Sequence, residues 1–160
     1  LSGETGCGKS TQVPQFLLEA AIYAGRGAEC SVVCTQPRRI SAIGLAERVA
    51  AERGERVGEV VGYSVRLDSC QSARTRLLFC TTGILLRRLL GDPSLSDLTH
   101  IVLDEVHERS VDSDLLLLLL RGLMAKAKHL KVVLMSATAD SELFAKYFEQ
   151  SGYGVARLHI

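Results

Sequence analysis

The first eleven residues combine residue types that suit phosphate binding. Gly3, Gly8, Lys9 and Ser10 stand at the spacing of a P-loop, whose glycines let the backbone curl until several N–H groups point at one anion. We expect the Lys9 ammonium to reach the outer phosphates of a nucleotide and the Ser10 hydroxyl to ligate magnesium. The alternative is a flexible turn that matches by chance, and the apolar helical pattern that follows disfavours it. The residues expected to surround the phosphates are Gly3, Glu4, Thr5, Gly6, Cys7, Gly8, Lys9, Ser10 and Thr11.

A pair of carboxylates, Asp104 and Glu105, follows an apolar run far along the chain. Asp104 suits magnesium binding, directly or through water, and Glu105 suits both a place near the metal and the activation of an attacking water. An acid pair after a strand is common, and on its own it is equally well explained as a solvated loop. Together with Lys9 it predicts the second half of a nucleotide site.

Apolar periodicity predicts alternating strands and helices along the chain. The predicted helices cover residues 10–24, 40–53, 82–90 and 112–128, and the predicted strands cover residues 31–35, 59–65, 76–80, 100–103 and 131–135. This alternation favours an α/β fold, with a mostly parallel sheet and helices on both faces. The leucine-rich helix at 112–128 is expected to be packed on most sides. The polar motifs fall where strands end, which is the ligand-binding edge of such a sheet.

The position of the P-loop predicts a truncated domain. A P-loop follows a buried strand that delivers it to the sheet edge, and only Leu1 and Ser2 precede Gly3. We therefore expect residues 1–160 to be a single domain that lacks the strand before the P-loop, belongs to a larger protein and folds poorly by itself.

Composition limits the class of protein. With 47% apolar and 23% charged residues, the chain is globular, and a net charge of +1 gives no global sign of a nucleic-acid or membrane partner. The five cysteines are odd in number and lack zinc-site spacing, which favours buried or incidental thiols in a reducing compartment. The longest apolar run, Leu115 to Leu120, is far shorter than the roughly 20 residues that span a bilayer. We expect an intracellular protein, cytoplasmic or nuclear, without a membrane segment.

The sequence Asp104-Glu105-Val106-His107 resembles motif II of the DExH-box helicases of superfamily two, in their DEAH/RNA-helicase branch. The other segments that resemble this family, in its order, are residues 3–11 (motif I), Thr35-Gln36-Pro37-Arg38-Arg39 (motif Ia), Thr81-Thr82-Gly83 (motif Ib) and Ser136-Ala137-Thr138 (motif III). Val106 departs from the alanine of the strict DEAH pattern. The resemblance covers nearly the whole chain and implies the first RecA-like lobe, a P-loop NTPase domain, of an ATP-dependent RNA helicase that uses ATP and Mg²⁺.

The resemblance also implies roles for individual residues. Lys9, Asp104, Glu105 and His107 would form the catalytic set, and Arg48 would stack on the nucleotide base. The residues that would contact the backbone of single-stranded RNA are Arg38, Arg39, Arg66, Thr81 and Thr82. The residues that would couple phosphate state to lobe movement are His107, Ser136, Ala137 and Thr138. From the residues alone, the arginines equally fit exposed surface positions, and His107 equally fits a loop cap.

The same resemblance implies a second RecA-like lobe as a partner. The family's arginine fingers lie in that lobe and contribute roughly 10³ to 10⁵ in rate. The 160-residue chain should therefore bind nucleotide weakly without efficient turnover or unwinding. Two alternatives stay open: a P-loop ATPase that acts on DNA or remodels complexes, and a catalytically inactive RNA-binding scaffold. Intact Lys9, Ser10, Asp104 and Glu105 argue against the second.

Overall fold

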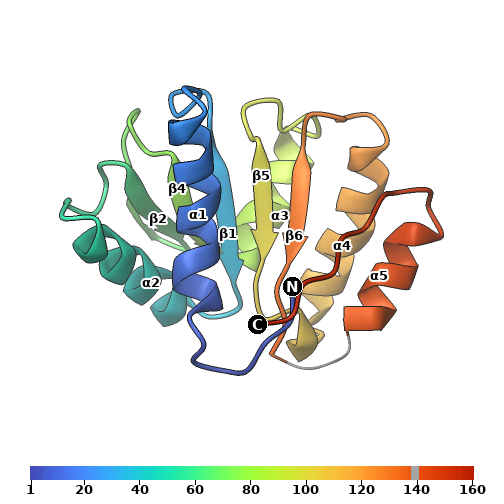
Figure 1. Ribbon diagram of the computed structural model, residues 1–160. Coiled ribbons are helices and arrows are strands. Elements are labelled where there is room, and N and C mark those ends of the chain that lie inside the picture. Colours follow the sequence, from blue (N-terminus) through green and yellow to red (C-terminus); the bar gives the residue numbers. More distant parts are fainter. Residues whose placement is uncertain (138–140) are drawn as a thin grey trace.

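A computed structural model describes residues 1–137 and 141–160, in which helices cover both faces of a six-stranded sheet (Figure 1). The strand order is β3-β2-β4-β1-β5-β6, and every neighbouring pair is parallel except β2 with β3. The strands are β1 (Val32–Gln36), β2 (Val61–Val65), β3 (Asp68–Cys70), β4 (Leu77–Thr81), β5 (His100–Leu103) and β6 (Lys131–Leu134). The helices are α1 (Lys9–Tyr23), α2 (Arg39–Glu52), α3 (Thr82–Gly91), the 3₁₀ turn η1 (Val106–Glu108), α4 (Val111–Met124) and α5 (Ser141–Glu149).

The predicted α/β architecture is confirmed, with three local differences. The short strand β3 was not predicted because Asp68–Cys70 has no apolar alternation; it forms by antiparallel pairing with β2. Helix α4 ends at Met124 rather than at residue 128, because the chain turns to bury Ala127 and Leu130 before β6. Helix α5 lies beyond the last predicted element.

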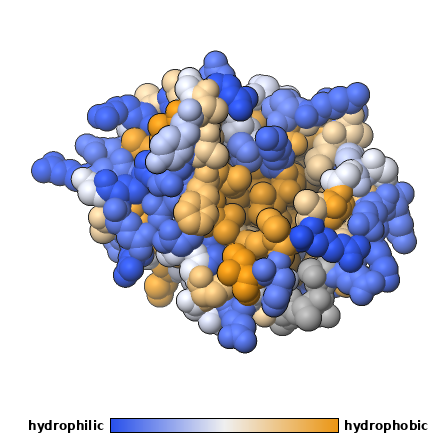
Figure 2. All heavy atoms as spheres, in the orientation of Figure 1, coloured by the Kyte–Doolittle hydropathy of each residue, from blue (hydrophilic) through white to orange (hydrophobic). Residues whose placement is uncertain are grey.

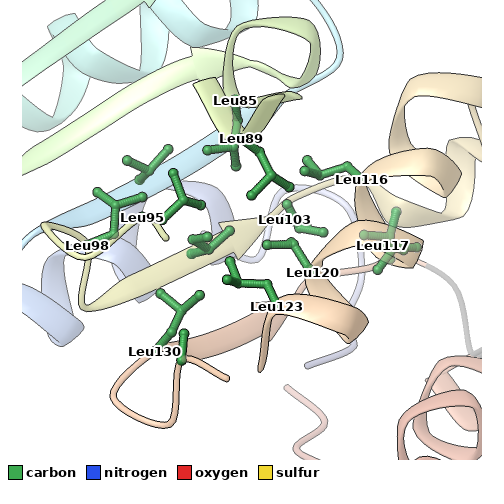
Figure 3. Close-up of a cluster of buried hydrophobic side chains, with 14 of the residues drawn as sticks. Leu85, Leu89, Leu95, Leu98, Leu103, Leu116, Leu117, Leu120, Leu123 and Leu130 are labelled. Carbon is green, nitrogen blue, oxygen red and sulfur yellow. The ribbon is translucent and has the colours of Figure 1, made fainter. Parts of the chain in front are cut away.

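The two faces of the sheet carry separate apolar cores. Side chains of a strand alternate between faces, so Val32 packs under α1 and α2 while its neighbour Val33 packs under α3, α4 and α5. Figure 3 shows leucines from α3, α4 and β5 converging in the second core. Leu116 and Leu120 of α4 are fully buried there, whereas Leu118 is 50% exposed. Helix α4 therefore packs most of its leucines against the core and also has a solvent-facing side.

The carboxyl ends of the parallel strands form one edge, and the chain's beginning joins it. The Leu1 amino group donates to the Leu134 carbonyl (2.8 Å), and Gly3 N–H donates to the Ser136 carbonyl (3.2 Å). Ser2 forms parallel bridges to both Ser136 and His159. The P-loop therefore starts beside the end of β6. In residues 1–137 and 141–160, no helix has the length and apolar character needed to cross a membrane.

Candidate functional site

The P-loop curls tightly into the start of α1. Gly6 and Gly8 adopt φ values of 86° and 90°, in the left-handed region where glycine has no steric cost. Gly8 is the N-cap of α1, so the first N–H groups of the helix face the loop. The Lys9 side chain is buried, and its ammonium donates to the carbonyls of Gly3 (2.6 Å) and Glu4 (2.7 Å). The loop thus encloses a positive charge at a helix N-terminus, which is an anion-binding arrangement.

The other P-loop residues present an accessible rim. Glu4, Thr5 and Cys7 are exposed, and Ser10 is partly buried in the first turn of α1. The Thr11 hydroxyl donates to the Gly8 carbonyl (3.0 Å) and so closes that first turn. The expected phosphate-binding residues are therefore contiguous in space as well as in sequence.

Asp104 and Glu105 leave the end of β5 at the same edge. Asp104 is buried, and its two carboxylate oxygens accept hydrogen bonds from the Gln36 amide (2.6 Å) and from the Glu105 N–H (2.9 Å). Glu105 has φ 55°, a left-handed backbone that is uncommon for a residue with a side chain. Such strain is concentrated at functional sites, where surrounding structure holds it in place.

The charged groups that affect the Glu105 carboxyl come from both the P-loop and the segment after β5. Burial raises the pKa of its carboxyl above the usual value, and the charges of Asp104 and Glu108 raise it further. His107 and Lys9 lower this pKa, so the P-loop lysine lies close enough to act on the carboxylate after β5. A raised pKa makes a carboxylate a better proton acceptor for water at neutral pH.

His107 connects the segment after β5 to the segment after β6. Its Nδ1 accepts a hydrogen bond from the Ala137 N–H (3.2 Å), which places the proton of the neutral ring on Nε2. Nε2 lies 3.3 Å from a Glu105 carboxylate oxygen. Ser136, next to Ala137, is buried beside the start of the P-loop. Thr138, the remaining predicted coupling residue, lies outside the described residues.

The predicted RNA contacts lie at the ends of β1, β2 and β4. Arg38 and Arg39 follow β1 and are exposed, and Arg66 is exposed in the turn after β2. Thr81 occupies the N-cap position of α3 without a side-chain capping bond, and the next residue, Thr82, is buried. Because β1, β2 and β4 are parallel, all five predicted RNA contacts lie at the edge of the sheet that also holds the P-loop. Of the five, only Thr82 is buried.

Arg48, the predicted base-stacking residue, lies on the exposed side of α2 in a hydrogen-bonded network. Its Nε donates to Glu52 (2.6 Å), whose other carboxylate oxygen accepts from the amides of Gln12 (3.1 Å) and Gln15 (2.9 Å) of α1. The bond from Arg48 is the main cause that lowers the pKa of the Glu52 carboxyl. The network ties α2 to the helix that begins at the P-loop.

Sequence reasoning assigned no role to five residues of these networks: Gln12, Gln15, Gln36, Glu52 and Glu108. Glu108 pairs with Arg38 (3.3 Å between N and O), an exposed ion pair. Glu52 stands four residues after Arg48, so helical i,i+4 spacing was a usable signal. Gln36 was predicted to lie in the loop after the strand at residues 31–35, within the segment that resembles motif Ia, and neither position identifies its partner.

The donor set fits magnesium held jointly with phosphates. Asp104, Glu105 and Ser10 offer oxygen atoms, and Mg²⁺ typically takes one or two carboxylates, retained waters and substrate phosphates rather than an all-protein cage. The described part of the chain contains no group of three or more His, Cys, Asp or Glu side chains that could hold a metal ion.

An apolar groove of about 500 Å³ lies between β6, α5 and residues 153–158, and Leu1, Val106 and Ser136 also line it. Figure 2 shows apolar side chains gathered in the middle of the corresponding face. Neither Lys9 nor Asp104 lines the groove, and its lining is mostly apolar. It does not suit a triphosphate, which needs N–H groups and cations.

Comparisons with known proteins agree with this geometry. A DEAD/DEAH box helicase family model matches residues 1–145. The chain is 59% identical over its whole length to the DExH-box ATP-dependent RNA helicase DExH3 of Arabidopsis thaliana. Over 92% of the chain, it is 56% identical to the human putative ATP-dependent RNA helicase DHX57 and 57% identical to the chicken ATP-dependent RNA helicase DHX30. The chain spans 13%, 11% and 12% of these relatives. With the P-loop and the acid pair in one site, and with a family match over most of its length, the chain belongs to the DEAD/DEAH box helicase family.

Proposed function

We propose that this chain is the ATP-binding lobe of an ATP-dependent RNA helicase, which couples ATP hydrolysis to translocation on RNA or to its unwinding. The observation that carries the proposal is geometric: the P-loop that encloses Lys9 begins beside the end of β6, and Asp104 and Glu105 leave the neighbouring strand β5 at the same edge of the sheet. The relatives named as ATP-dependent RNA helicases support the choice of nucleotide and polymer.

The proposed roles follow from chemistry at that edge. The N–H groups of residues 3–11 and the Lys9 ammonium would bind the phosphates. Ser10, Asp104 and Glu105 would hold Mg²⁺, which supplies charge neutralisation at the phosphates when bound. Glu105 would orient and deprotonate the attacking water, with His107 holding its carboxylate through Nε2.

RNA and a second RecA-like lobe are the proposed partners. Arg38, Arg39, Arg66, Thr81 and Thr82 would hold the sugar-phosphate backbone of a single strand, because backbone contacts carry no sequence information and suit a motor that must pass any sequence. The hydrogen bond between His107 and Ala137 would let the segment around Ser136 respond to the nucleotide. Residues 1–160 as a truncated single domain, and a cytoplasmic or nuclear location, stay predictions.

Polymer-stimulated ATP hydrolysis tests the proposal. In the full-length protein we expect single-stranded RNA to increase the rate of phosphate release, and DNA of the same sequence to increase it less. Equal stimulation by both polymers would favour the alternative of a P-loop ATPase acting on DNA. A protein with no ATP hydrolysis in either condition would contradict the enzymatic proposal and favour the scaffold alternative.

Arg48→Ala tests the proposed nucleotide-base contact. Cation–π stacking contributes about 0.5–2 kcal/mol, so the variant should bind ATP roughly 2- to 30-fold more weakly. Its affinity for inorganic tripolyphosphate should stay unchanged, because that ligand has no base. Arg87→Ala, at an exposed position of α3, is the matched control. Competition binding with both ligands checks this, and an equal loss for ATP and tripolyphosphate would contradict base stacking.

A further inference from the structure

A short side-chain hydrogen bond of the candidate site joins two buried polar residues from neighbouring strands. Gln36 is the last residue of β1 and is 3% exposed; Asp104 follows β5 and is 6% exposed. The two strands are parallel, with Thr35 opposite Leu103, so Gln36 and Asp104 come next in the ladder. The Gln36 amide donates to Asp104 Oδ2 at 2.6 Å. The roles proposed above make no use of Gln36.

Strand alternation fixes the direction of both side chains. Val32 and Cys34 of β1 belong to the core under α1 and α2, and so does Val102 of β5. Gln36 and Asp104 stand two residues further along each strand, so they share that face. This is the face covered by α1, whose N-terminus is the P-loop.

The chemistry of an amide donor differs from that of a cation. An arginine or lysine beside Asp104 would hold the carboxylate but would also offset the negative charge that attracts a metal. A neutral amide holds one oxygen and leaves the charge intact. The Glu105 N–H holds the other oxygen at 2.9 Å, so each oxygen has one protein donor and can still accept a further interaction.

We propose that Gln36 is a positioning residue, which fixes the Asp104 carboxylate in the orientation that receives magnesium bound to a nucleotide. This inference rests on the proposed nucleotide site and adds to it a residue that acts through Asp104. Hydrogen-bonded partners of metal ligands typically change metal affinity or activity by roughly 10–100-fold when they are removed.

A purely structural role is the competing explanation, because two buried polar groups that pair with each other also satisfy each other. The two roles differ in what they predict for ligand binding. A structural role changes thermal stability and affects nucleotide binding with and without magnesium alike. A positioning role changes the magnesium requirement selectively.

The test measures binding of a fluorescent ADP analogue to the full-length protein while the free Mg²⁺ concentration is varied. Gln36→Met keeps the length of the side chain and removes the donor. We expect it to need roughly 10–100-fold more Mg²⁺ for half-maximal enhancement of binding, with affinity in EDTA unchanged. Gln36→Leu, which also removes the donor, should show the same loss.

Thr35→Val is the matched control, since Thr35 is buried in the same strand but alternates to the opposite face. It should keep the wild-type Mg²⁺ requirement. Two results would overturn the positioning role. One is a folded Gln36→Met variant with the Mg²⁺ requirement of the wild type, and the other is loss of folded structure in both Gln36 variants. A wild-type protein that binds the analogue with no Mg²⁺ dependence would overturn the proposed metal site, and this inference with it. Wild-type Mg²⁺ dependence together with unchanged variants would overturn only the role of Gln36.

Discussion

Glu105→Gln is expected to lower the ATP turnover of the full-length protein by roughly 10²- to 10⁴-fold while leaving ATP affinity within a few-fold of wild type. Glutamine has the shape of glutamate, and its carbonyl oxygen can keep the position of the present carboxylate oxygen, 3.3 Å from His107 Nε2. What the amide lacks is the ability to take a proton from water. Single-turnover phosphate release measures the loss, and equilibrium binding of ATP measures what is retained.

The control for this variant is Glu142→Gln, an exposed glutamate of α5 that pairs with Lys146 on its own helix. Its turnover should match wild type. If Glu105→Gln hydrolyses ATP at an undiminished rate, the proton acceptor is another group and Glu105 loses its proposed role. If the variant instead loses ATP binding, Glu105 serves chiefly as a metal ligand and not as the proton acceptor.

The P-loop could be predicted from the sequence because its conformation depends on neighbouring residues of one segment. Gly6 and Gly8 have positive φ values and Lys9 begins a helix, and these are properties of a contiguous segment. The acid pair was predictable for the same reason, since a four-residue apolar strand carries it to the sheet edge. That both segments lie at one edge of the sheet was expected from one topological rule, the common direction of parallel strands.

Contacts between strands could not be predicted in the same way. Gln36 and Asp104 are 68 positions apart, and their pairing depends on β1 lying next to β5 in a particular register. A sequence pattern gives the direction of parallel strands, but it does not give their order or register. The strand β3 was missed for a related reason, because pairing with β2 rather than apolar alternation makes it a strand.

The contacts of His107 show that the fold, and not the local sequence alone, determines the role of this side chain. Its sequence position allowed either a loop cap or a coupling role, and periodicity could not separate the two. The structure gives it two partners from different segments, the Ala137 N–H and the Glu105 carboxylate. A histidine that only capped a loop would not bridge the turn after β5 and the residues after β6. This bridge is what makes the coupling role a concrete proposal.

Lys9→Ala is expected to weaken ATP binding by at least roughly 100-fold. The Lys9 ammonium now donates to the carbonyls of Gly3 (2.6 Å) and Glu4 (2.7 Å), inside the curl of the P-loop. In the proposed complex it donates to phosphate oxygens instead, and two such charge-assisted bonds contribute about 1.5–3 kcal/mol each. The loss should be largest for ATP and smallest for adenosine, which has no phosphates.

The matched control is Lys128→Ala, an exposed lysine in the turn before β6. Calorimetric titration with ATP, ADP and adenosine, together with thermal melting, distinguishes two roles of Lys9: stabilising the P-loop and binding phosphate. If Lys9→Ala melts at a lower temperature but binds all three ligands like wild type, its bonds to Gly3 and Glu4 serve the loop alone. If ATP affinity falls steeply while adenosine affinity and the melting temperature hold, the ammonium is a phosphate ligand. The loop carbonyls then hold the ammonium only when no nucleotide is bound, because its three N–H groups cannot donate to two carbonyls and two phosphate oxygens at the same time.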